Sequence, residues 1–69
     1  MVYVFLANGF EEMEALAPVD LLRRAGVEVF TVGVGSDMIV SSHNIPVKTY
    51  TTVDKIVLND ELEMIVLPG

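Results

Sequence analysis

Two apolar runs flank a helical pattern within the first half of the chain, and this order of segments most constrains the fold. Val2–Ala7, with the sequence VYVFLA, is rich in β-branched and aromatic residues and alternates only weakly. Such a run is typical of a strand covered on both faces, as in a parallel sheet. Val27–Val34, VEVFTVGV, predicts a second strand. A strand, a helix and a strand within about thirty residues form a βαβ unit with two parallel strands.

The helix between these strands is expected over roughly Glu11–Ala25. Acidic residues occupy its first turn and Arg23 and Arg24 its last turn, and both placements agree with the helix dipole. Gly26 is expected to close the helix in a left-handed conformation. Apolar residues at every fourth position predict the face of the helix that is buried. Its members are Met13, Ala17, Leu21 and Ala25, with Leu22 alongside.

The second half of the chain predicts shorter elements. A β-hairpin is expected from the strands Met38–Val40 and Ile45–Thr49, joined by the residues SSHN. It follows a break in the chain at Gly33, Gly35, Ser36 and Asp37. Thr51–Val57 predicts a short helix capped by one of its threonines. Leu62–Leu67, LEMIVL, predicts another buried strand. The whole is an α/β arrangement with a mainly parallel sheet, expected to be incomplete because one helix covers only one sheet face.

Composition narrows the class of protein. The chain has 69 residues, enough for one small domain, and its ten acids against four bases argue against a nucleic-acid partner. No apolar run approaches the roughly 20 residues of a membrane span, and the opening residues lack the pattern of a secretory signal. A cytoplasmic protein is therefore expected. The chain has no cysteine and one histidine, so we expect no disulfide, thiol nucleophile or metal site. No cofactor is expected either.

A nucleotide site is also not expected. The first turn, ANGFEEMEA, lacks the G-x-G-x-x-G pattern that a dinucleotide requires. Three acidic residues at the start of the helix would repel a pyrophosphate. Ligands of open α/β sheets nevertheless gather outside the carboxyl ends of the strands. Asn8–Glu14 leaves the first strand and Pro68-Gly69 leaves the last, so we expect a site where these two segments meet.

Pro18 singles out Glu14 within that edge. Proline has no N–H, so the carbonyl of Glu14 loses its helical partner, and either a kink or two short helices with Pro18 at the start of the second would result. Glu14 is expected against the apolar stripe, whereas Glu11 and Glu12 are expected to reach water. Burial favours the protonated carboxyl, which donates a hydrogen bond. The alternative is an acid that only complements the helix dipole.

The segment FLANGFEEMEALAPVDLLRRAGVEVFTVGV closely resembles the opening of the ThiJ/PfpI superfamily, which contains a chaperone and glyoxalase associated with Parkinson's disease. Its pattern, G-x-E-E-x-E-x-x-x-P-x-D-x-L-R-R-A-G, is specific, and MIVLPG resembles the family's D-x-[IV]-[IV]-L-P-G-G. The resemblance covers Val2–Gly69 but only about the first third of a typical member. It implies that residues 1–69 are the amino-terminal part of a flavodoxin-like three-layer sandwich.

The resemblance also implies roles for two residues. Glu14 matches the family's acid, whose carboxyl hydrogen-bonds the nucleophilic cysteine and stabilises its thiolate. Gly69 matches the first glycine of the Pro-Gly-Gly turn, whose N–H helps to form an oxyanion site. The nucleophile and the histidine that often follows it are absent from this sequence. His43 is expected to be a loop residue, and the acids at 60, 61 and 63 are expected to be solvated.

These matches imply an amino-terminal fragment of a cysteine-dependent protein. The parent protein would act on small carbonyls such as methylglyoxal, on amide bonds as an amidase or protease, or as a redox-responsive chaperone. The 69 residues alone are expected to be inactive and to self-associate, or to pair with a complementary carboxyl-terminal fragment. The alternative is a non-catalytic piece that serves interaction or oligomerisation.

Overall fold

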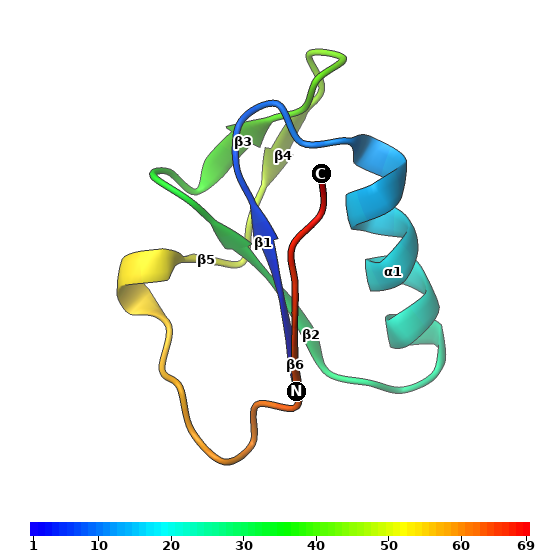
Figure 1. Ribbon diagram of the computed structural model, residues 1–69, viewed down its shortest axis with the longest axis vertical. Coiled ribbons are helices and arrows are strands. Elements are labelled where there is room, and N and C mark those ends of the chain that lie inside the picture. The colour runs from blue at the N-terminus through cyan, green and yellow to red at the C-terminus, as the bar shows by residue number, and fades with distance from the viewer.

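A four-stranded parallel sheet forms the centre of the molecule, and the computed structural model describes all 69 residues (Figure 1). The strand order is β5-β2-β1-β6, with a separate two-stranded antiparallel hairpin, β3-β4. The elements in chain order are β1 Val2–Leu6, α1 Glu12–Arg24, β2 Val29–Gly33, β3 Met38–Val40, β4 Pro46–Lys48, β5 Thr51–Thr52, the 3₁₀ turn η1 Val53–Lys55, and β6 Met64–Val66.

Strand β1 lies between β2 and β6, and both pairings are parallel. Val4 at its centre stands opposite Thr31 on one side and Val66 on the other. The predicted βαβ unit and the predicted hairpin are therefore both confirmed, as is the mainly parallel sheet. Parallel pairing also brings the residues that follow β1 and β6 to the same edge of the sheet.

Helix α1 is one continuous helix with Pro18 inside it, so the alternative of two short helices is wrong. Glu11 caps its start, since the Glu11 carboxylate accepts a hydrogen bond from the Met13 backbone N–H. The predicted left-handed residue after its end is confirmed by the φ of 81° at Gly26. With 13 residues, α1 is neither long nor apolar enough to cross a membrane, and no other helix of the structure is.

The face of α1 that packs on the sheet is not the predicted one. Ala15 and Val19 are buried there, with Leu22 partly buried against the same core, whereas Met13 and Leu21 are 72% and 66% exposed. Both sets satisfy helical spacing, so periodicity alone could not choose between them. The small Ala15 and Val19 side chains are the ones against the sheet, and the larger Met13 and Leu21 face away from it.

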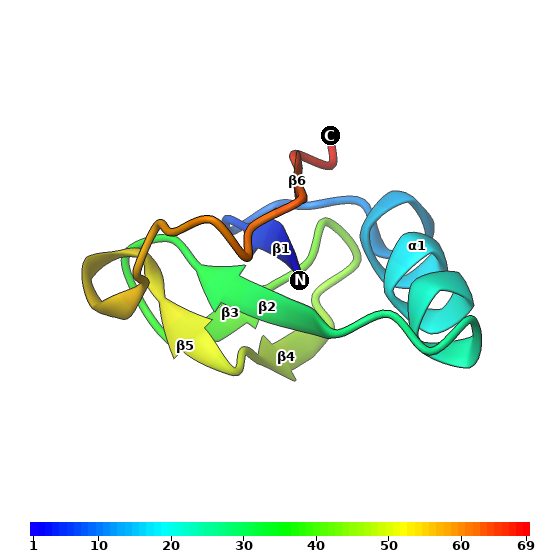
Figure 2. The same ribbon diagram turned by 90° about the horizontal axis from the view of Figure 1, so that it is seen from below.

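The core lies between α1 and one face of the sheet. Alternate residues of β1 contribute Val2, Val4 and Leu6, and Ile39 of the hairpin joins them. On the other side of the strands from α1 runs the 53–63 segment, yellow to orange, in both views (Figures 1 and 2). It approaches the sheet at Tyr3, whose hydroxyl donates to the Val57 carbonyl at 3.1 Å.

Two predictions for the last third are wrong in detail. Thr51–Val57 forms β5 and a single 3₁₀ turn instead of a helix, because Thr51 and Thr52 pair with β2. The strand at Leu62–Leu67 shortens to β6, and its residues are exposed or half-buried instead of buried. β6 is an edge strand with β1 as its one sheet neighbour, so half of its surroundings is open.

Candidate functional site

A hollow of about 250 Å³ opens at the carboxyl ends of the strands, where the sequence predicted a site. Its walls come from three strand ends and the segments that leave them. The lining residues are Phe5, Ala7, Asn8, Gly9, Phe10, Val34, Leu67, Pro68 and Gly69. The lining is mostly apolar with backbone polar groups among it, which is the usual make-up of a small-molecule site.

Glu14 and Gly69 meet at this edge, although they are 55 positions apart in the sequence. A first side-chain carbon added at Gly69 would lie 2.8 Å from Glu14 Oε2, so the carboxylate stands directly beside the glycine. Next to it, the Glu11 backbone N–H donates to the Gly69 carbonyl at 2.8 Å. The start of α1 and the tip of β6 are thus joined, which confirms that the two segments share an edge.

The expected burial of Glu14 is wrong for these 69 residues, because the residue is exposed. It was placed against an apolar stripe that the structure turns away from the core. Its carboxylate instead borders the tip of β6 at the open edge of the sheet. The packing of α1 on the sheet therefore does not shield the Glu14 carboxylate from solvent.

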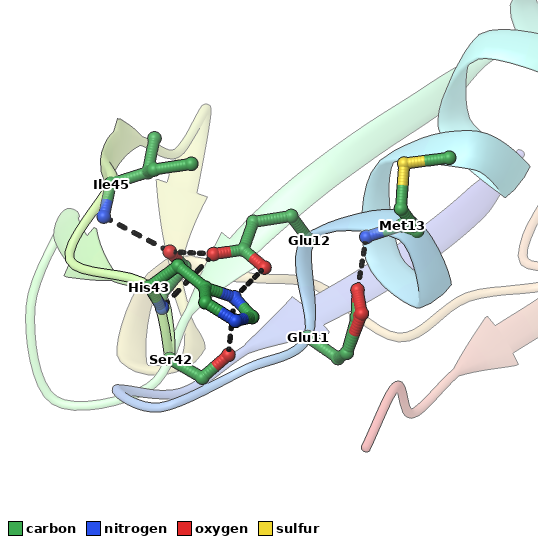
Figure 3. Close-up of polar contacts among 7 residues, drawn as sticks. Glu11, Glu12, Met13, Ser42, His43 and Ile45 are labelled. Atoms are coloured by element: carbon green, nitrogen blue, oxygen red, sulfur yellow. Dashed lines mark hydrogen bonds and ion pairs between the residues drawn. The ribbon is translucent and has the colours of Figure 1, made fainter.

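Glu12, expected to reach water, is the acid that the chain encloses. Its side chain is 14% exposed and its carboxylate points at the turn between β3 and β4 (Figure 3). The Ser41 hydroxyl and the His43 backbone N–H both donate to Oε2, and His43 Nδ1 lies 2.9 Å from Oε1. The hydrogen bonds from Ser41 and His43 lower the pKa of Glu12 to about 2. The same carboxylate raises the pKa of His43 above its ordinary 6.5.

Sequence reasoning missed this cluster because its members are about thirty positions apart and belong to no motif. His43 does lie in a loop, as expected, but it contacts the helix start. The pairing depends on the hairpin folding back on the 8–10 turn. There the Asn8 side chain accepts from the Val40 N–H at 2.9 Å, and the Gly9 N–H donates to the Val40 carbonyl at 2.8 Å.

Of the three acids expected to be solvated, Glu63 has a partner. Its carboxylate lies 2.8 Å from the amino-terminal ammonium of Met1, and this contact lowers the pKa of Glu63. The ammonium also donates to the Glu61 carbonyl at 2.7 Å. These contacts hold β6 beside the start of β1 at the end of the sheet opposite to the hollow, so they shape the sheet and not the candidate site.

The strand tips therefore present a carboxylate, a glycine turn and an apolar hollow at one edge of an open α/β sheet. The chain is thus an open α/β structure, and the carboxyl ends of the parallel strands are the edge at which proteins of this class bind ligands. The model of the DJ-1/PfpI family matches residues 1–69. The chain belongs to this family.

Curated relatives come from distant organisms. Protein dj-1beta of Drosophila melanogaster is 37% identical over 67 residues, which cover 96% of this chain and 35% of that protein. Protein DJ-1 homolog B of Arabidopsis thaliana is 35% identical over 69 residues, which cover 99% of this chain and 16% of that protein. The chain thus spans about a third or less of these relatives.

Solved structures of the family share the fold. A cysteine-to-alanine mutant of a DJ-1 superfamily protein from Salmonella typhimurium superposes with a TM-score of 0.88 at 41% identity. That match covers 99% of this chain and 37% of the other. The oxidized DJ-1 of Toxoplasma gondii gives a TM-score of 0.88 at 33% identity, again over 99% of this chain and 37% of its own. The α/β fold with a mainly parallel sheet is therefore that of the family.

Proposed function

We propose that residues 1–69 are the amino-terminal part of a cysteine-dependent DJ-1/PfpI protein, to which they supply Glu14 and Gly69. The observation that carries the proposal is the contact at the sheet edge, where the Glu14 carboxylate lies beside Gly69, a residue that lines the hollow. A cysteine thiol placed there by the remainder of the domain would have a carboxyl partner and a backbone donor within reach. Two solved relatives are described as a cysteine mutant and as an oxidized form.

In this proposal the two residues act at different stages of the chemistry. In its protonated form the Glu14 carboxyl donates a hydrogen bond to the cysteine sulfur and favours the thiolate, the form that attacks carbonyl carbon or is oxidised. The Gly69 N–H stabilises the oxyanion that forms when the thiolate adds to a carbonyl. The hollow of about 250 Å³ suits a small substrate. The remainder of the domain would cover Glu14, which the 69 residues leave exposed.

The substrate class is proposed to be a small reactive carbonyl such as methylglyoxal, in a cytoplasmic protein. Amide hydrolysis and redox-responsive chaperoning are the other activities consistent with a thiolate at this edge. Turnover of methylglyoxal by the complete polypeptide, but not by residues 1–69 alone, is the expected result. Turnover by residues 1–69 alone would contradict the proposal, because the chain holds no nucleophilic cysteine.

Replacing Gly69 with alanine tests whether Glu14 acts on the thiol from its position beside the glycine. The added carbon would meet Glu14 Oε2 at 2.8 Å, and the carboxylate, at the end of a flexible side chain, would swing away without moving the backbone. We therefore expect G69A to raise the pKa of the cysteine thiol in the complete protein while the melting temperature stays within about 2 °C. An unchanged thiol titration would show that Glu14 does not act from this position.

A second candidate function is self-association, which the exposed apolar residues of α1 favour. Met13 and Leu21 lie two turns apart on one face of the helix, and Ala17 stands between them. Exposed apolar patches of this kind mark interaction surfaces. We propose that this face binds a second copy of the chain, which would bury surface that the sheet leaves free.

Substituting Leu21 with glutamate tests this association. A charge in an apolar contact is expected to move the dimerisation midpoint to at least about tenfold higher concentration, or about 1.4 kcal/mol. Sedimentation velocity over a range of concentrations measures the midpoint. Leu58→Glu is the matched control, because Leu58 is as exposed as Leu21 but lies on the 53–63 segment. A monomeric wild-type protein, or equal effects of the two variants, would contradict binding through α1.

A further inference from the structure

The Glu12 carboxylate is the most fully engaged acid of the chain. Both of its oxygens contact the β3–β4 turn, with donors from the Ser41 hydroxyl, the His43 backbone N–H and the His43 ring (Figure 3). Ser41 is itself buried, and its hydroxyl also accepts from the Ile45 N–H at 3.0 Å. The Glu12 carboxylate is therefore part of the hydrogen-bond network of the β3–β4 turn as well as of the first turn of α1.

Backbone contacts make the segment 8–12 a junction between the hairpin and β6. On the hairpin side, the Ser42 N–H donates to the Phe10 carbonyl at 2.9 Å, next to the Asn8 and Gly9 contacts with Val40. On the β6 side, the Glu11 N–H donates to the Gly69 carbonyl. Contacts that hold residues 8–12 against the hairpin therefore also act on the helix start that carries Glu14 and on Gly69, which follows β6.

We propose that Glu12, Ser41 and His43 form a proton-sensitive clasp, which locks the β3–β4 turn onto the start of α1 and thereby sets the positions of Glu14 and Gly69. Glu12 is in this sense a positioning residue. The consequence for a thiol rests on the function proposed above, but the clasp itself does not. It is a property of these 69 residues and has its own readout at His43.

The pH dependence of the clasp follows from the pKa shifts of His43 and Glu12. His43 in the folded protein has a pKa above 6.5, so its contribution is fully present below pH 6.5 and is lost as the pH rises through the folded value. Glu12 has a folded pKa of about 2 against an ordinary 4.5, so its contribution is present above pH 4.5 and is lost as the pH falls toward 2. The clasp is therefore closed most tightly between about pH 4.5 and 6.5.

When the His43 ring loses its proton, its contact with Glu12 weakens but the β3–β4 turn stays bonded to the start of α1. A neutral imidazole that carries its proton on Nδ1 still donates to the Glu12 carboxylate, but the attraction between opposite charges is lost. The Ser41 hydroxyl and the His43 backbone N–H keep their hold on Oε2 at any pH at which Glu12 is ionised. The other charged group that faces the ring is Glu11, which acts in the same direction as Glu12. The His43 side chain is 75% exposed, so added salt should weaken the effect.

Nuclear magnetic resonance of the complete polypeptide that carries these residues tests the clasp. The His43 ring and the backbone amides of Glu14 and Gly69 are followed between pH 4.5 and 9. In the wild type, the His43 midpoint is expected above 6.5, and both amides are expected to shift with the same midpoint. In Glu12→Gln the His43 midpoint should fall toward 6.5, whereas Glu28→Gln, which removes the same charge at an exposed site, should leave it in place.

His43→Gln provides a second variant that keeps the turn but removes the proton. In it, the Glu14 and Gly69 amides should lose the shift that followed His43. Amides in the wild type that do not follow His43, or a His43 midpoint that is the same in Glu12→Gln, would overturn the clasp. None of these readouts involves the thiol, so a failed thiol assignment for Glu14 would leave this result standing, and the converse also holds.

Discussion

Replacing Glu14 with leucine in the complete protein is expected to cause a roughly thirtyfold loss of thiol reactivity at pH 7. Leucine fills similar space but offers no hydrogen bond to sulfur, so the thiol pKa should return toward the ordinary value of about 8.5. At pH 7 only about 3% of such a thiol is ionised, whereas a thiol with a strongly depressed pKa is almost fully ionised. Ultraviolet absorbance of the thiolate as a function of pH measures the change directly.

Two further variants separate hydrogen bonding from charge. Glu14→Gln keeps a side-chain hydrogen-bond donor beside Gly69 and should preserve part of the depressed thiol pKa. Glu61→Gln removes one negative charge from an exposed position at the other end of β6 and should leave the thiol unchanged. A thiol pKa that is the same in Glu14→Leu as in the wild type would retire the proposed role, and the family relationship would remain as common ancestry alone.

The sequence predicted local elements well, because their signals lie within a few residues of one another. The β1 run, the hairpin strand Met38–Val40 and the helix end at Gly26 were predicted within about a residue. Each depends on a short-range rule, such as strand composition or a glycine that tolerates positive φ. The edge at which Asn8–Glu14 and Pro68-Gly69 meet was also predicted, because the carboxyl ends of parallel strands lie at the same edge of the sheet.

The errors concern contacts between segments that are distant in sequence. The helix face was misassigned because the Ala15 and Met13 stripes both satisfy the helical period, and only the sheet selects between them. For the same reason the burial expected of Glu14 belongs instead to Glu12. Glu12 is enclosed by a hairpin about thirty positions away, and no local signal distinguishes it from its neighbours. Burial on a surface made by another segment is not encoded in the spacing of one helix.

Gly33 was predicted to lie within the strand Val27–Val34 and to begin the break after it; it ends β2 and lies under the loop that follows. It pairs with Leu6 in β1 and with Thr52 in β5. A carbon added to Gly33 would lie 2.0 Å from the Ser36 carbonyl oxygen and 2.9 Å from Thr49 Oγ1. Thr49 is buried, and its hydroxyl donates to the Asp37 carbonyl at 3.0 Å, so the Thr49 side chain cannot move freely.

Gly33→Ala is therefore expected to destabilise the protein by about 2–3 kcal/mol through overpacking alone, a large share of a typical folding free energy. Gly35→Ala is the matched control in the same loop. Gly35 has a φ of 86° and open space around it, so alanine there should cost only about 1 kcal/mol in backbone strain. Urea unfolding midpoints measure both losses. Equal losses would mean that the loop shifts to admit the methyl group, and Val34, which bonds Leu6 and lines the hollow, would then move with it.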